Sequence, residues 1–301
     1  MAVTEIQELD TYCSRLLGAD QIKDYCPIGL QVENAGPIHR IVSGVTASEA
    51  LIQAAIEREA NAVLVHHGYF WRGEPESLVG MKFRRIKALI DNNIALLAYH
   101  LPLDTHAQYG NNAQLGQKLG LMTDGALAAG GTDNLFWYGH LTEPLSAVEF
   151  GEHIESVLGR KPVYAGPDQN FGRTSVGYSV RPSEEQPFEE RHSEEQPNIK
   201  QPNIKQPGTN HPGEDSRLIR TVGWCTGGAQ QFVTVAAERG LDAYISGEIS
   251  EQTTHVAREC GVHYFAAGHH ATERYGVLAL GEHLAEQFDV SHQFVDIDNP
   301  A

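Results

Sequence analysis

Three short, largely apolar runs in this chain each lead directly into a cluster of histidine and acidic residues. The runs are Ala62–Val65, Ile94–Tyr99 and Val262–Gly268. Apolar runs of this length are typical of strands that are buried on both faces, as in a parallel sheet. A sheet of such strands needs helices over both faces, so the runs restrict the chain to a layered α/β fold.

Segments with helical spacing of apolar residues alternate with the apolar runs. The first is Thr4–Leu17, where five apolar side chains recur on one helical face. The alternation of helices and strands predicts two or more layers around mostly parallel sheets. Further helices are expected near 48–58, 81–92, 111–119, 149–158, 229–239 and 249–259, and further strands near 38–45, 161–164, 221–225 and 242–246.

The polar cluster after each apolar run is rich in residue types that bind metal ions. In open α/β sheets, ligands bind beyond the carboxyl ends of the strands. Three clusters at three strand ends are therefore expected to converge on one cleft. Their members are His66 and His67, then His100 and Asp104, and finally His269, His270 and Glu273.

Local geometry leaves the ligand set of these clusters partly open. Successive residues on a strand point to opposite sides, so His66 and His67 either serve two ions or supply a single ligand. His269 and Glu273 lie four residues apart and share one face if a helix follows the third run. These two side chains can then bind one ion together. The alternative, that the histidines are capping or core residues, would have to hold at three strand ends at once.

The ligand types narrow the choice of metal. Imidazole and carboxylate groups suit zinc, iron, manganese, cobalt or nickel, and the clusters contain no cysteine of the kind that closed structural zinc sites use. Two ions about 3.5–4 Å apart lower the pKa of a shared water molecule and stabilise an oxyanion. We therefore predict two divalent metal ions per chain and a metal-dependent enzyme.

Two further features lie at the ends of expected strands. Glu248 follows the strand near 242–246 and is a candidate general base, or a partner that orients a ligand histidine, or a solvated turn residue. The Gly227-Gly228 pair precedes an expected helix. It either offers backbone N–H groups to an anion or is a plain connection between strand and helix.

The charge of the chain argues against a polyanionic partner. It contains 22 Lys and Arg residues against 39 Asp and Glu, a formal net charge of −17, so nucleic acid and anionic membranes are not expected partners. A metal pair would add local positive charge, so a small anionic or nucleotide-like substrate is compatible with the negative net charge of the chain. Met1–Asp20 lacks the features of a secretory signal, and the four scattered cysteines are typical of the reducing cytoplasm.

The segment 181–215 differs from the rest of the chain. It contains Ser-Glu-Glu-Gln-Pro at 183–187 and 193–197, and Gln-Pro-Asn-Ile-Lys at 196–200 and 201–205. Short tandem copies that are rich in Pro, Gln and Glu cannot bury a core. We expect a low-complexity surface loop here, either without a function of its own or acting as an arm for a partner.

Eight stretches of the chain together match a known family. They are Tyr25–Glu33, Gly44–Ser48, Val65–Trp71, His100–Asp104, Gly110–Ala113, Gly223–Gly228, Ser246–Gln252 and Gly268–Arg274. In these stretches the chain resembles the Nif-three-like dinuclear-metal proteins, also called GTP cyclohydrolase I type 2 homologues. The resemblance covers nearly the whole chain outside the 181–215 segment and fits the short members of the family.

The resemblance implies two interlinked α/β domains with a pair of metals in a cleft. We expect a metal-binding domain from 1–124 and 262–301, and a second α/β domain at 125–261 that contains the loop at about 181–215. The family also implies a hexameric ring with its sites facing an internal cavity. The resemblance selects His269 over His270, and it assigns metal ligands to His66, His67, His100, Asp104, His269 and Glu273.

Three functions are compatible with these features. The first is a dinuclear metal-dependent hydrolase that acts on a nucleotide or purine ring, a substrate class implied by the resemblance alone. The second is a non-enzymatic ring protein that presents metal or recruits a partner. The third is a metallopeptidase or amidohydrolase. An enzyme needs an open coordination position on its metal, whereas a storage site is filled by protein ligands.

Overall fold

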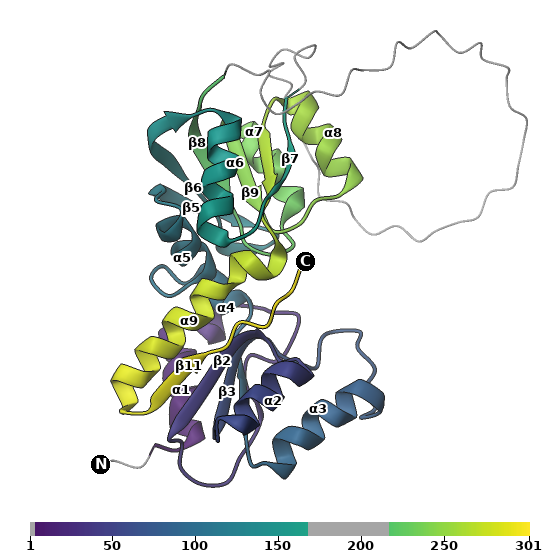
Figure 1. Ribbon diagram of the computed structural model, residues 1–301, viewed down its shortest axis with the longest axis vertical. Helices are drawn as coiled ribbons and strands as arrows, with labels where there is room; N and C mark the ends of the chain where they lie inside the picture. The colour runs from purple at the N-terminus through teal and green to yellow at the C-terminus, as the bar shows by residue number, and fades with distance from the viewer. Residues whose placement is uncertain (1–3, 168–216) are drawn as a thin grey trace, which may run out of the picture.

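The computed structural model of the protein describes residues 4–167 and 217–301, which form two α/β halves stacked along the long axis (Figure 1). The loop predicted at 181–215 lies outside the described residues. The layered α/β fold predicted from the apolar runs is confirmed, because each half has one sheet covered by helices on both faces. Among the described residues, none of the helices has both the length and the apolar character that a membrane span requires.

The first half contains a five-stranded sheet. The strand order is β1 (Gly29–Val32), β4 (Ala95–Ala98), β3 (Ala62–His67), β2 (Arg40–Thr46) and β11 (Ser291–Phe294). All neighbours are parallel except β1, which pairs antiparallel with β4 at the edge. Helix α1 (Ile6–Leu16) packs with α9 (His269–Phe288) on one face, and α2 (Glu49–Glu57) and α3 (Gly80–Asp91) pack on the other.

The second half contains a six-stranded mixed sheet. The strand order is β5 (Met122–Ala129), β6 (Thr132–Leu145), β8 (Ile219–Trp224), β9 (Ala243–Ser246), β10 (His263–Ala266) and β7 (Val163–Ala165). On one face lie α5 (Asn111–Lys118) and α6 (Ala147–Leu158), and on the other lie the short helix η2 (Gln230–Phe232), α7 (Val233–Glu238) and α8 (Glu251–Cys260).

Only the centre of this second sheet is parallel. Strands β8, β9 and β10 run parallel, whereas the β5–β6, β6–β8 and β10–β7 pairs are antiparallel. Gly130 and Gly131 connect β5 to β6, with φ values of 57° and 80°. Two consecutive residues with positive φ form the turn of a tight hairpin, which forces antiparallel pairing. The expectation of mostly parallel sheets therefore fits the first half better than the second.

Helix α9 joins the two halves. It follows β10 of the six-stranded sheet and then runs across the first half (Figure 1). The chain thus leaves the six-stranded sheet after residue 266, five residues beyond the end of the expected second domain at 261. The domain division itself stays a prediction. Two short helices complete the connections of the first half, η1 (Ala19–Gln21) and α4 (Leu101–Thr105).

Strand β11 carries a histidine, His292, that is bonded to β2 and packs against α9. His292 and the Ser43 hydroxyl share a hydrogen bond of 2.7 Å. Gly281 of α9 leaves room for the imidazole, because a Cβ atom there would lie 2.2 Å from His292 Nε2. Burial lowers the pKa of His292 to about 4, so the folded protein keeps this ring neutral in mild acid.

This pKa predicts a loss of stability in acid. The unfolded chain protonates His292 near pH 6.5, but the folded protein does so only near pH 4. The contribution of His292 to stability is therefore full above about pH 6.5 and declines as the pH falls to about 4. Solvent screens this partly exposed ring, so we expect a loss on the order of 1 kcal/mol. Urea unfolding at several pH values measures it. An equally steep pH dependence in His292→Gln would contradict the assignment.

Candidate metal centre

The three polar clusters come together between the two halves of the molecule. His66 and His67 end β3, His100 and Asp104 follow β4, and His269 and Glu273 open α9. Within the described residues, four groups of three side chains have ligand atoms within 4.8 Å of one another and could hold a metal ion. The groups are His66-His67-His100, His66-Asp104-Glu273, His67-His269-Glu273 and Asp24-Cys26-His100.

Glu273 lies at the centre of the cluster. Its Oε1 is 3.5 Å from His66 Nε2, and its Oε2 is 3.3 Å from both His67 Nε2 and His269 Nε2. These separations exceed the 2.7–3.2 Å of ordinary hydrogen bonds. Two ligands on one tetrahedral zinc-like ion, each bound at about 2.1 Å, lie roughly 3.4 Å apart. The spacing around Glu273 therefore fits ligands that share a cation.

Two buried polar atoms of the cluster support this fit. His66 Nε2 and Glu273 Oε2 have no hydrogen-bond partner, although their side chains are only 0% and 4% exposed. An unsatisfied buried polar atom is costly unless another group completes its interactions. A cation between these atoms would satisfy both of them.

Each of the four histidines is held by its other ring nitrogen, so Nε2 is the atom left for the cluster. The partners of Nδ1 are the Tyr99 carbonyl for His66 (3.0 Å), the Thr46 hydroxyl for His67 (3.1 Å), Asp24 Oδ1 for His100 (2.7 Å) and Glu248 Oε1 for His269 (2.7 Å). Asp24 was not among the residues predicted from the sequence. It lies 76 residues before His100 and belongs to no metal-ligand spacing.

Asp104 is fixed by two side chains from the second half, on α5 and on the turn after β8. Its Oδ1 accepts hydrogen bonds from Asn111 Nδ2 at 2.9 Å and from the Thr226 hydroxyl at 3.3 Å. Asn111 Oδ1 in turn accepts from the Gly276 N–H at 3.1 Å. This contact needs a glycine, because a Cβ at 276 would lie 2.8 Å from the backbone nitrogen of Asn111. Asn111 and Thr226 were also missed by the sequence analysis, although both lie in family-like stretches.

The electrostatics of the cluster separate its histidines into two kinds. Burial lowers the pKa of His66, but the carboxylates of Asp104 and Glu273 outweigh burial and raise it to about 9. For His269 burial is likewise outweighed, by Glu273 and Glu248, and its pKa is raised to about 9. Burial and three neighbouring histidines lower the pKa of His67 to about 3. The surroundings therefore favour the protonated form of His66 and His269 and the neutral form of His67.

The carboxylate of Glu273 stays ionised in this setting. Burial favours its neutral form, but His67 and His66 hold its pKa well below the usual range. An ionised carboxylate among imidazoles is a donor set that suits a divalent cation.

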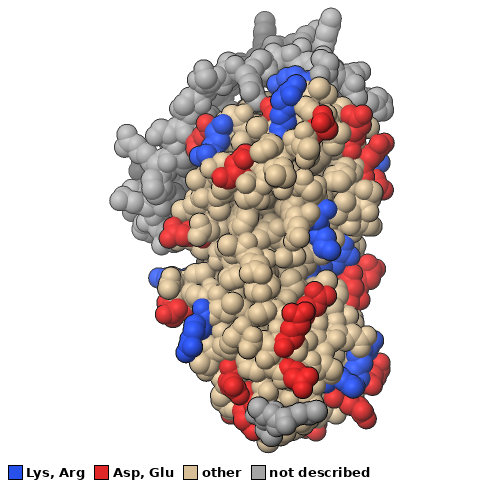
Figure 2. Space-filling view, turned by 90° about the vertical axis from the view of Figure 1, so that its left-hand side faces the viewer, with Lys and Arg blue, Asp and Glu red and all other residues tan. Residues whose placement is uncertain are grey.

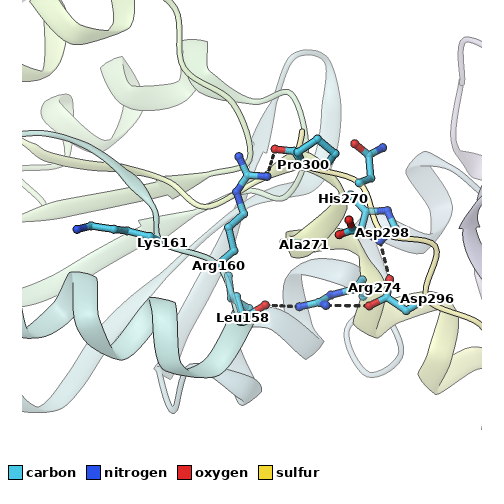
Figure 3. A pocket seen from close by; sticks show the side chains of 11 residues that line it. Leu158, Arg160, Lys161, His270, Ala271, Arg274, Asp296, Asp298 and Pro300 are labelled. Carbon is cyan, nitrogen blue, oxygen red and sulfur yellow. Dashed lines mark hydrogen bonds and ion pairs between the residues drawn. The ribbon is translucent and has the colours of Figure 1, made fainter.

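His270 faces away from the cluster. Its Nε2 is 2.7 Å from Asp296 Oδ1, and Arg274 donates to the other oxygen of the same carboxylate at 2.9 Å. Figure 3 shows these side chains beside a separate cavity of about 400 Å³, which Asp296 and residues 298–300 also line. Of the two adjacent histidines, His269 is therefore the one that reaches the cluster.

The turn after β8 also approaches the centre. Gly227 has φ of 66°, and a Cβ atom there would lie 2.1 Å from Glu273 Oε1. Only glycine combines this backbone conformation with such a close approach. Glu248 lies opposite, at the end of β9, with its side chain 46% exposed. Glu248 thus combines exposure to solvent with a hydrogen bond to His269.

Comparisons with known proteins identify the family of the chain. The family model for Duf34/NIF3 (NGG1p interacting factor 3) matches residues 4–300. The GTP cyclohydrolase 1 type 2 homolog of Vibrio cholerae is 48% identical, and the match covers 97% of this chain and 98% of that protein. The homolog of Escherichia coli K12 is 42% identical, with 98% of each chain covered.

Solved structures give the same result. A structure described as protein ybgI of unknown function has a TM-score of 0.79 and 41% identity, and the match covers 99% of this chain and 100% of that one. TTHA1606 from Thermus thermophilus has a TM-score of 0.73 and 25% identity, with the same coverage. The resemblance inferred from the polar clusters is thereby confirmed, and the chain belongs to the Duf34/NIF3 family.

Proposed function

We propose that the protein is a dinuclear metal-dependent hydrolase that acts on a nucleotide or purine ring. The observation that carries the proposal is the position of Glu273. One of its oxygens faces His66, and the other faces His67 and His269. A carboxylate placed in this way can serve two cations at once. The names of the relatives, GTP cyclohydrolase 1 type 2 homolog, support the substrate class.

We assign three protein ligands to each cation. His66, Asp104 and Glu273 would hold the first, and His67, His269 and Glu273 the second, with His100 beside His66 and His67. Three protein ligands leave a coordination position open, as in catalytic sites. A bound pair of this kind supplies an acidified water and a positive charge that stabilises an oxyanion. Zinc, iron, manganese, cobalt and nickel all suit these ligands.

Glu248 is the residue that we propose to accept and return a proton. Its Oε1 takes the hydrogen bond from His269, while nearly half of the side chain is exposed. Its Oε2 lies near Gly228, at 3.5 Å from the position of a Cβ atom there. The carboxylate can therefore orient His269 with one oxygen and exchange a proton with a substrate through the other.

We also propose that the chain assembles into a hexameric ring with the sites facing inward. Figure 2 shows one face of the molecule with a broad central area that carries few charged side chains. The cores of protein interfaces are depleted of charged residues in the same way. Sedimentation equilibrium of the purified protein measures the mass of the assembly directly.

The metal content provides the first test. We expect two divalent ions per chain, because the cluster offers six candidate ligands and one tetrahedral ion needs only four. Elemental analysis of gently purified protein, before and after reloading, gives the stoichiometry. A content that stays at or below one ion per chain after reloading would contradict the pair.

The activity is tested by a turnover screen. Metal-loaded protein is incubated with nucleotides, cyclic amides and short peptides, and Asp104→Ala serves as the inactive control. We expect hydrolysis of a nucleotide or purine substrate that is lost in the control together with the metal. Cleavage of cyclic amides or peptides alone would instead favour the amidohydrolase or metallopeptidase alternative. Intact, metal-replete protein without any turnover would favour the non-enzymatic ring protein.

A further inference from the structure

Some ligand side chains of the candidate metal centre are buried, and others are exposed to solvent. The side chains of three ligands are almost fully buried, namely His66 (0% exposed), Glu273 (4%) and Asp104 (8%). Three others are partly exposed, namely His100 (15%), His67 (17%) and His269 (29%). A ligand that reaches the cluster must therefore approach along the exposed histidines.

Trp71 borders this approach beside two of the exposed histidines. Its ring centroid lies 4.9 Å from that of His100, with the planes at 83°, and 6.0 Å from that of His67. The indole N–H donates to the Gly68 carbonyl at 3.2 Å, which fixes the orientation of the ring. Trp71 is only half-buried, so part of its surface is open to a ligand.

Tyr25 provides a second aromatic ring near His100. The two ring centroids are 6.3 Å apart, and Tyr25 is 51% exposed. The backbone N–H of Arg72 donates to the Tyr25 carbonyl at 2.8 Å, which ties this segment to the loop that carries Trp71. The Arg72 guanidinium lies 6.0 Å from the tyrosine ring and adds a positive charge beside it.

The loop that carries Trp71 is held in a strained conformation. Phe70 has φ of 65°, a region that L-residues with a side chain rarely adopt. The Glu74 carboxylate braces the loop by accepting hydrogen bonds from the backbone N–H groups of Phe70 (2.9 Å) and Trp71 (3.2 Å). Lys82 completes the brace, with its Nζ 3.2 Å from the same carboxylate. Strain that persists beside a site indicates a functional requirement for the loop geometry.

We propose that Trp71 and Tyr25 form an aromatic rim that binds the planar heteroaromatic ring of a ligand by stacking. Trp71 is then a specificity-determining residue that selects ligands with a base over ligands that carry only sugar and phosphate. Aromatic side chains stack on any nucleobase because every base presents a π-face. This inference rests on the proposed function for the position of the ligand, and it adds the residues that recognise its ring.

The test measures binding, independently of turnover. GMP and ribose 5-phosphate are titrated into metal-loaded protein by calorimetry, and GMP also by tryptophan fluorescence. The other two tryptophans, Trp137 and Trp224, are 7% and 0% exposed, so quenching reports on Trp71. We expect GMP to quench the fluorescence, and Trp71→Leu to weaken GMP binding about 10- to 100-fold. Ribose 5-phosphate should bind the wild type and the variant equally.

Phe70→Leu is the matched control. Phe70 is 36% exposed on the same loop, but its ring lies under Lys82 Nζ, at 4.7 Å, and makes no ring contact with the histidines among the described residues. The Phe70→Leu protein should bind GMP like the wild type. Tyr25→Leu should weaken GMP binding as Trp71→Leu does. Metal content and thermal melting are measured for every variant, and Trp71→Phe should restore most of the GMP affinity.

Three binding results would overturn the rim. The first is unchanged GMP affinity in Trp71→Leu, and the second is no GMP binding by the wild type. The third is an equal loss of ribose 5-phosphate affinity, which would mean that Trp71 only supports His100. If Trp71→Leu selectively loses GMP binding but the wild type hydrolyses no substrate, the aromatic rim is supported and the hydrolase function is refuted. Hydrolysis that is indifferent to Trp71 would refute the rim alone.

Discussion

Glu273→Ala is expected to remove both metal ions from the chain. Glu273 lies within 3.3–3.5 Å of three histidine nitrogens, so the substitution deletes a ligand of both proposed cations. Loss of a residue that merely orients a ligand lowers metal affinity about 10- to 100-fold. We expect a loss of more than about 100-fold for this shared ligand, and undetectable turnover with it.

Elemental analysis and competition with a chromogenic chelator measure the change. Glu282→Ala is the control, because Glu282 is an exposed carboxylate further along the same helix. Thermal melting of both variants after chelator treatment separates metal loss from misfolding. A Glu273→Ala protein that keeps one ion at wild-type affinity would show that the carboxylate is not shared.

Glu248→Gln is expected to keep both metal ions and to lose about 10²–10⁴-fold in turnover, the usual contribution of general acid–base catalysis. The amide oxygen of glutamine can still accept the hydrogen bond from His269 Nδ1, so the orientation of that ring is preserved. The amide cannot accept a proton at neutral pH. The substitution therefore isolates proton transfer from the positioning of His269.

Metal content and turnover are measured on the same preparation, beside Glu251→Gln, which changes an exposed carboxylate at the start of α8. Full metal content with undiminished turnover would exclude Glu248 from the chemistry. Joint loss of metal and turnover would instead assign Glu248 a positioning role through His269. The pH profile of the remaining activity distinguishes this last case from proton transfer.

Much of the first half could be predicted from local sequence alone. The continuous apolar runs before His66 and His100 are strands β3 and β4, because side chains that alternate between two buried faces must all be apolar. Ser48 begins α2 as its cap, with its side chain accepting from the Leu51 N–H. The histidine clusters at the strand ends identified the family before any contact between them was known.

The mixed sheet of the second half and the last strand, β11, could be identified only from the tertiary structure. Strand β11 was not predicted, since Ser291–Phe294 is only partly buried and has no apolar run. It forms because α9 carries the chain back across the first sheet to the open edge of β2. Pairing at a free edge depends on where the chain arrives, which local composition does not record.

The sequence by itself determined the layered fold, the family and the six side chains of the cluster. The tertiary structure alone decided how these side chains are held. It placed Asp24 on His100, Glu248 on His269, and Asn111 and Thr226 on Asp104. Such partners are separated from their targets by as many as 122 residues and follow no periodicity. The physical reason is that periodicity reports which side chains are buried locally, whereas the partner of a buried polar atom is set by the packing of distant segments.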